Sequence, residues 1–275
     1  MEKWDIAFPN LGIYLENVPK NFEIFGLTIA FYGVIIAMGV LLGFSLTNHE
    51  SNRLGYPKDI WWDFAVPAIF FSLLGARLYY VIFSWDYYGQ HPGEILNIRG
   101  GGLAIYGGVI GGFLTLLVFC KIKKIDMLSY LDLMIPSVAL AQGFGRIGCF
   151  LAGCCYGKET DSFLGVVFTN SDFAPNGVKV LPTQLFMAGG DLIIMAILLW
   201  YAAKRPMRGR TSALYLILYS IGRFAIEFLR NDDRGTVGAL STSQFIAIFT
   251  LLAGVLGFFV VLPKLDQKGN VRSAE

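Results

Sequence analysis

The stretch LDLMIPSVALAQGFGRIGCFLAG, residues 131–153, is long and apolar enough to cross a lipid bilayer. It carries an arginine, Arg146, inside the glycine-rich run GFGRIGCF of residues 143–150. A guanidinium at that depth costs about 2.5–3.5 kcal/mol on insertion scales, and it stays protonated there. We expect a chain that keeps such a group to use it to hold an anion, and lipid phosphate is the abundant anion of a bilayer.

The composition is that of an integral membrane protein. Of the 275 residues, 55% are hydrophobic and 15% are charged, whereas ordinary soluble domains carry about 25% charged residues. The net charge of +2 is too small to suggest a nucleic-acid partner. The N-terminal segment lacks the basic region and apolar core of a cleavable signal peptide, so we expect the first hydrophobic segment to remain as a helix.

Apolar segments of about 20 residues predict spanning helices. The sequence contains about seven, at residues 22–46, 61–83, 103–120, 131–150, 182–203, 212–228 and 243–262. Because open strands cannot satisfy their backbone groups in lipid, we predict an all-α, polytopic membrane protein with one domain over residues 1–275. The loops of one side hold twelve Lys and Arg residues against seven on the other. This asymmetry predicts a cytoplasmic C-terminus and an outside N-terminus.

Few charged residues lie inside the predicted spans: Asp63, Arg77, Asp132, Arg146, Asp191, Arg223 and Glu227. Asp63 and Asp132 open their segments, which favours a structural role. Asp191 follows Gly189-Gly190, so a kink or helix contact competes with function there.

Tyr219, Arg223, Glu227 and Arg230 are spaced by four, four and three residues, which places them on one helix face. Arg223 and Glu227 form either a buried pair or part of an anion site. One glutamate cannot neutralise several arginines, so the excess positive charge favours an anion.

Glycine is concentrated between residues 100 and 112. Gly107/Gly111 and Gly108/Gly112 have the spacing that lets membrane helices approach closely. The preceding run of residues 100–102 lies at the predicted outer interface, where backbone N–H groups can receive an oxyanion. Tyr106 places a phenol one turn inside.

Three of the four cysteines, Cys149, Cys154 and Cys155, lie close together in the sequence. No pair has Cys-x-x-Cys spacing, and no Cys/His set has zinc-finger spacing. Three interpretations remain open for them: small packing residues at a crowded helix end, a thiol pair, or a soft-metal site.

An ordered series of motifs resembles the prolipoprotein diacylglyceryl transferase family over nearly the whole chain. The motifs are FYG (31–33), GARLYY (75–80), GGLAIYGG (101–108), GRIG (145–148), PTQL (182–185), RFAIEFLR (223–230) and GALS (238–241) with Gln244. The family signature is Gly-Arg-x-Gly-Asn-Phe-x-Asn-x-Glu-x-x-Gly. Here Cys149, Ala152 and Cys154 replace its two asparagines and its glutamate.

The resemblance implies an enzyme of the bacterial cell membrane that transfers diacylglycerol from phosphatidylglycerol to the lipobox cysteine of prolipoproteins. A thioether forms and glycerol phosphate leaves. Membrane lipids are its further partners, and neither a metal nor an organic cofactor is expected.

The residues thereby implied fall into two groups. The catalytic ones are Arg146, Arg223 and Tyr106. Those binding substrate are Arg146, Arg77, Tyr32, Gly101, Gly102 and Glu227. Because signature residues are replaced, three alternative functions stay open. The first is a divergent lipid transferase with another acceptor, and the second is a non-catalytic lipid-binding or transport protein. The third is a redox or metal module built on the cysteines.

Overall fold

The computed structural model describes residues 3–24, 27–97, 101–231 and 235–265. Within these ranges, seven helices are long and apolar enough to cross a membrane, so the predicted polytopic helical class is confirmed. Gly100 of the predicted anion-binding run lies outside the described residues. The chain divides into two compact units, one of Met1–Leu46 with Leu131–Glu275 and one of Thr47–Tyr130.

The spanning segments agree closely with the predicted ranges. They are α1 (Phe31–Arg53), α2 (Ile60–Phe83), α4 (Ile105–Lys123), α5 (Met127–Leu151), α6 (Thr183–Ala203), α7 (Arg210–Ile226) with its 3₁₀ extension Glu227–Leu229, and α8 (Thr242–Leu256) with a π-helical turn, Gly257–Val261. The short helix α3 (Trp85–Tyr88) and the 3₁₀ turns Pro9–Leu11 and Pro92–Glu94 are the remaining helical elements. The first spanning helix is the exception, because it both begins and ends later than the predicted range 22–46: residues 21–24 and 27–30 form a pair of antiparallel strands instead.

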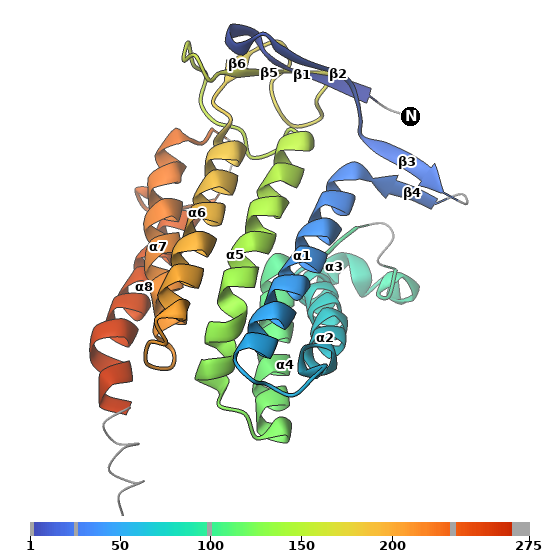
Figure 1. Cartoon of the computed structure of the whole chain (residues 1–275). Coiled ribbons are helices and arrows are strands. Elements are labelled where there is room, and N and C mark those ends of the chain that lie inside the picture. The colour runs from blue at the N-terminus through green and yellow to red at the C-terminus, as the bar shows by residue number, and fades with distance from the viewer. Residues whose placement is uncertain (1–2, 25–26, 98–100, 232–234, 266–275) are drawn as a thin grey trace, which may run out of the picture. The chain divides into compact units, whose positions relative to one another are not determined.

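In the first unit, α5, α6 and α7 pack around a shared apolar core (Figure 1). Its buried members are Ile135 and Ala139 of α5, Leu198 of α6 and Tyr215 of α7. The helices α1 and α5 approach closely at glycines. A Cβ added at Gly39 would lie 2.5 Å from the Phe144 side chain, so a larger residue there would push the two helices apart.

Short strands cover one end of this helix group, which the sequence analysis did not foresee (Figure 1). A four-stranded sheet has the order β2-β1-β5-β6. The remaining strands form two hairpins. The bounds are β1 Lys3–Phe8, β2 Ile13–Pro19, β3 Asn21–Ile24, β4 Leu27–Ala30, β5 Val166–Thr169, β6 Lys179–Val180, β7 Thr236–Val237 and β8 Leu240–Ser241. Ile6, Phe168 and Val180 of the sheet bury their side chains against Phe150, so the sheet is attached to the end of α5.

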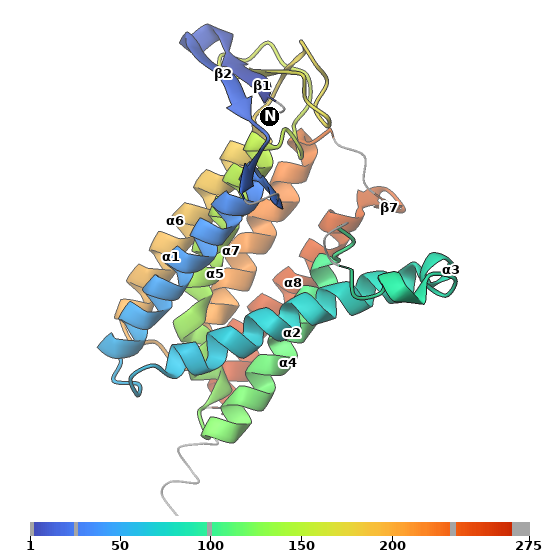
Figure 2. The same ribbon diagram turned by 90° about the vertical axis from the view of Figure 1, so that its right-hand side faces the viewer.

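The second unit is built on the pairing of α2 with α4 (Figure 2). The Cβ of any residue larger than glycine at Gly107 would overlap the backbone of Gly75, and at Gly111 that of Phe71. The predicted close-approach role of these glycines is therefore confirmed. Asp63 pairs with Lys123 at 2.5 Å across the same two helices, which supports its structural interpretation.

Asp132 has a structural role as well, because it caps a neighbouring helix. Its carboxylate accepts hydrogen bonds from the backbone N–H groups of Gly209 (2.6 Å) and Ser212 (2.7 Å), and from the Ser212 hydroxyl (2.6 Å). These donors lie at the start of α7, where N–H groups have no partner within the helix. The carboxylate on α5 thereby fixes the position of α7, which carries Arg223.

Candidate active site

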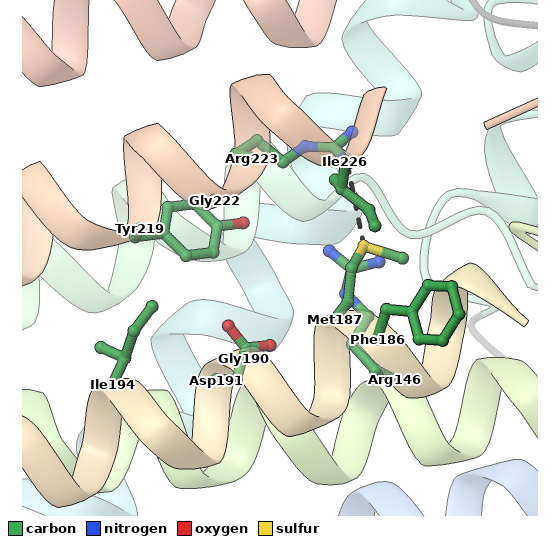
Figure 3. Close-up of a pocket in the computed structure, with 10 residues that line it drawn as sticks. All are labelled: Arg146, Phe186, Met187, Gly190, Asp191, Ile194, Tyr219, Gly222, Arg223 and Ile226. Carbon is green, nitrogen blue, oxygen red and sulfur yellow. Dashed lines mark hydrogen bonds between the residues drawn. The ribbon is translucent and has the colours of Figure 1, made fainter. Parts of the chain in front are cut away.

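A cavity of about 90 Å³ opens between α5, α6 and α7 in the first unit (Figure 3). A cavity of this size has room for several waters or for one compact anion. Its wall consists of Arg146, Phe186, Met187, Gly190, Asp191, Ile194, Tyr219, Gly222, Arg223 and Ile226. The structure thus brings together the two arginines that the sequence predicted as the phosphate-binding pair.

Arg223 reaches the cavity from α7 and is held by several partners. Its Nη2 donates a 2.6 Å hydrogen bond to the Ser243 hydroxyl and lies 3.1 Å from Oε2 of Glu227. Its Nη1 lies 3.9 Å from the Met187 sulfur. The side chains of Arg223 and Glu227 are only 11% and 7% exposed. Glu227 is not among the cavity-lining residues but is paired with Arg223, which is; its predicted substrate contact stays a prediction.

Arg146 reaches the cavity from α5, toward Met187 (Figure 3). Among the described residues, no carboxylate forms an ion pair with its guanidinium, and no hydrogen bond from it is recorded. The negative charge of Asp191 acts on this guanidinium from beyond ion-pair distance. A guanidinium with its donors available, next to a cavity, is arranged to receive an oxyanion.

Asp191 of α6 lines the same cavity and is buried, with 6% of its surface exposed. From the sequence, both a helix contact and a functional role were open for Asp191. The position of this carboxylate inside a predicted span was the signal in favour of function. The sequence could not show which side chains surround it. Asp191 and Tyr219, whose ring stacks on Tyr215 at 5.5 Å, are the polar side chains that line the cavity besides the two arginines.

The predicted single helix face of Tyr219, Arg223, Glu227 and Arg230 is only partly correct. The α-helix ends at Ile226, and Arg230 follows the 3₁₀ turn in an extended conformation. The buried guanidinium of Arg230 still points back toward α6, with Nη1 3.7 Å from the Met187 sulfur. It also hydrogen-bonds the sulfur of Cys155, so it connects the cavity wall to the cysteines.

Tyr32 lies in the first turn of α1 and is half exposed. Its backbone carbonyl faces Gly148, where an added Cβ would lie 3.2 Å away. Gly148 is two residues beyond Arg146, so Tyr32 belongs to the same end of the helix group. Its side chain does not line the cavity, and its substrate contact stays a prediction.

Arg77 belongs to the second unit and is committed to a loop. Its guanidinium donates four hydrogen bonds to backbone carbonyls, to Glu94 (2.7 Å), Ile95 (2.7 Å), Gly101 (3.0 Å) and Gly102 (3.0 Å). The side chain is 3% exposed. Four bonds leave one of its five N–H donors, so Arg77 positions this loop, and the phosphate binding predicted for it stays a prediction.

Gly101 and Gly102 form the end of that loop, immediately before α4. Both have positive φ, +86° and +74°, and a Cβ at Gly102 would lie 2.5 Å from Nη1 of Arg77. Only glycine fits there. Tyr106, in the first turn of α4, is 53% exposed. The predicted roles of these three residues toward substrate stay predictions.

Comparison with known proteins identifies the family. The family model described as "Prolipoprotein diacylglyceryl transferase" matches residues 19–260. The chain belongs to this family. It is 48% identical, over 87% of its length and 96% of the relative's, to "Phosphatidylglycerol--prolipoprotein diacylglyceryl transferase" of Clostridium tetani (strain Massachusetts / E88). It is 46% identical, over 85% and 91%, to "Phosphatidylglycerol--prolipoprotein diacylglyceryl transferase 2" of Clostridium perfringens (strain 13 / Type A).

The region shared with the prolipoprotein diacylglyceryl transferase family includes the whole cavity and most of the last spanning segment. Strand β1 and most of β2 precede it. Arg146, Asp191 and Arg223 therefore all lie within the region that the family model matches.

Cys154 and Cys155 follow the last residue of α5 and lie outside the span, next to Cys149 in its last turn, and the three thiols influence each other. Hydrogen bonds from Cys149 and Cys154, with the charge of Arg230, lower the pKa of the Cys155 thiol. The hydrogen bonds with Cys149 and Cys155, together with burial, raise the pKa of Cys154.

Proposed function

We propose that this protein transfers the diacylglyceryl group of phosphatidylglycerol to the cysteine thiol of a prolipoprotein lipobox. The observation that carries the proposal is the cavity that Arg146 and Arg223 share, in a chain 48% identical to a named transferase of this kind. We further propose a bacterial cell membrane location with the C-terminus in the cytoplasm, and that both units act as one membrane domain.

The two arginines have different tasks in this mechanism. Arg223 is fixed by Ser243 and Glu227, so it offers a rigid positive charge. Arg146 keeps its donors available for the phosphate, and a guanidinium fork matches two phosphate oxygens. As the C–O bond breaks, negative charge develops on the leaving phosphate, and pre-oriented cations in a low-dielectric site stabilise that charge most.

The reaction joins sulfur to carbon and breaks one C–O bond. The thiolate attacks the carbon of the diacylglyceryl group that carries the phosphate, and the thioether forms. The electron pair of the broken C–O bond stays on the phosphate oxygen, which leaves as part of glycerol phosphate. The thiol proton must depart first or at the same time. Asp191 is the carboxylate among the cavity-lining residues, and we assign it the proton; Tyr106 orients the thiol or the leaving oxygen.

The test combines the full-length protein with phosphatidylglycerol vesicles and a lipobox peptide. Mass spectrometry is expected to detect a diacylglyceryl peptide, and the same peptide with serine for cysteine is expected to stay unmodified. Arg146→Lys keeps the charge without the fork, so we expect at least about a 100-fold slower transfer. Arg208→Lys, in the exposed turn before α7, is the matched control and is expected to transfer normally.

Two results would contradict the proposal. Transfer at the normal rate by Arg146→Lys and Arg146→Met would remove Arg146 from the phosphate site. Binding of phosphatidylglycerol that depends on Arg146, without transfer to any cysteine peptide, would instead identify a non-catalytic lipid-binding protein.

A further inference from the structure

Three cysteine sulfurs converge where α5 ends, beside the cavity but not in its wall. The Sγ atoms of Cys149, Cys154 and Cys155 all lie within 4.8 Å of one another. None of the chain's four cysteines is in a disulfide. Sulfur ligands around a tetrahedral zinc, with Zn–S of about 2.3 Å, are about 3.8 Å apart. The three sulfurs therefore need to close by at most about 1 Å, a displacement within the range of rotation about the cysteine side-chain bonds.

The backbone holds the two later cysteines in place. After α5 the chain turns back through Gly153 (φ +70°) and Cys155 (φ +62°), and the Cys154 N–H donates to the Cys149 carbonyl at 3.1 Å. A positive φ at a non-glycine residue costs free energy. The turn at Cys155 is therefore held by surrounding contacts.

Those contacts come from the start of α6. Thr183 donates from its hydroxyl to the Cys155 carbonyl, and Gln184 donates from its amide to the Cys154 carbonyl, both at 2.7 Å. Both side chains are fully buried. Two buried hydrogen bonds at adjacent carbonyls fix the backbone of both cysteines, and with it the positions of their Cβ atoms.

We propose that Cys149, Cys154 and Cys155 form a three-thiolate site for Zn²⁺. Three thiolates and one Zn²⁺ carry a net charge of −1. The guanidinium of Arg230, 6% exposed and hydrogen-bonded to the Cys155 sulfur, supplies the compensating +1. A buried charge needs such a partner. Thiolate sulfur selects thiophilic d¹⁰ ions over Mg²⁺ or Ca²⁺.

The fourth zinc ligand comes from outside this set. Among the described residues, no histidine nitrogen or carboxylate oxygen joins the three sulfurs. Three protein ligands with an exchangeable fourth position are the arrangement of reactive rather than purely structural zinc. The bound ion would fix the turn after α5 against α6 and acidify whatever occupies its fourth position.

The experiment uses tag-free full-length protein in neutral detergent, reduced, equilibrated with micromolar Zn²⁺ and desalted. We expect about one zinc per chain by elemental analysis, protection of three thiols from a thiol reagent, and, with Co²⁺ instead, thiolate-to-cobalt charge-transfer absorption. Cys154→Ser and Cys155→Ser are expected to weaken binding at least about 100-fold. Cys120→Ser, which alters the cysteine outside the group, is the matched control and is expected to bind normally.

Zinc content, thiol protection and cobalt absorption do not depend on lipid transfer, so they test the zinc site whether or not the proposed transferase activity is found. Retention of no zinc by the reduced wild-type protein would overturn the site. Equal zinc retention by wild type, Cys154→Ser and Cys155→Ser would also overturn it. If a serine variant does not fold, thiol protection in the wild type decides: four thiols that react equally with and without Zn²⁺ would contradict the proposal.

Discussion

Removing either cavity arginine is predicted to abolish transfer but to change stability in opposite directions. Arg146 lies five residues before Leu151, the last residue of α5, or about 7.5 Å along the helix. It therefore sits in the outer part of the apolar layer, where a guanidinium costs less than the 2.5–3.5 kcal/mol of the bilayer centre. Because no ion pair of the described residues offsets this cost, Arg146→Met should raise the free energy of unfolding by about 1–2 kcal/mol.

Arg223→Met should do the reverse. It leaves Glu227, whose side chain is 7% exposed, without the guanidinium 3.1 Å away, and it takes the 2.6 Å donor from Ser243. Breaking a buried pair from one side costs about 3–5 kcal/mol, because the remaining charge is uncompensated. The double replacement Arg223→Met with Glu227→Gln should recover much of that loss without recovering transfer.

The measurement is reversible unfolding in neutral detergent, followed by tryptophan fluorescence, with and without added phosphatidylglycerol. We expect the lipid to stabilise the wild type, since a ligand that binds only the folded state shifts the equilibrium toward it. Arg146→Met should gain nothing from the lipid. A loss of 2 kcal/mol or more in lipid-free Arg146→Met would show that Arg146 has a structural partner, and would refute the assignment of its donors to phosphate.

Three further predictions concern the framework. Arg77→Met should expose the loop before α4 to protease and destabilise the second unit by about 3 kcal/mol, because four backbone carbonyls lose charged hydrogen-bond donors. Resistance to proteolysis equal to that of the wild type would contradict the loop-positioning role. Asp132→Ala should cost about 2 kcal/mol through the lost cap of α7, and Asp132→Asn less, both measured by unfolding. Gly107→Ala should disrupt the α2–α4 crossing and lower the yield of folded protein, whereas Gly189→Ala, which meets no atom within 4 Å, should be tolerated.

The sequence was sufficient for the spans and for several framework residues. The seven helices follow from local hydropathy, and the roles of Asp132 and of Gly107 with Gly111 follow from their positions in those helices. It was insufficient for Arg77 and Asp191. Both are charged residues in spans, yet one is bound to loop carbonyls and the other lines the cavity.

The sequence alone determines the pattern of membrane spans. In lipid the backbone N–H and C=O groups find hydrogen-bond partners only within their own helix, so each apolar segment forms a helix independently of the others. The partners of charged side chains depend on which helices pack together. Only tertiary structure placed Arg146, Asp191 and Arg223 around one cavity and brought the Cys154–Cys155 turn back to Cys149. The covering sheet likewise pairs β1 with β5 across more than half of the chain, a contact that no local pattern encodes.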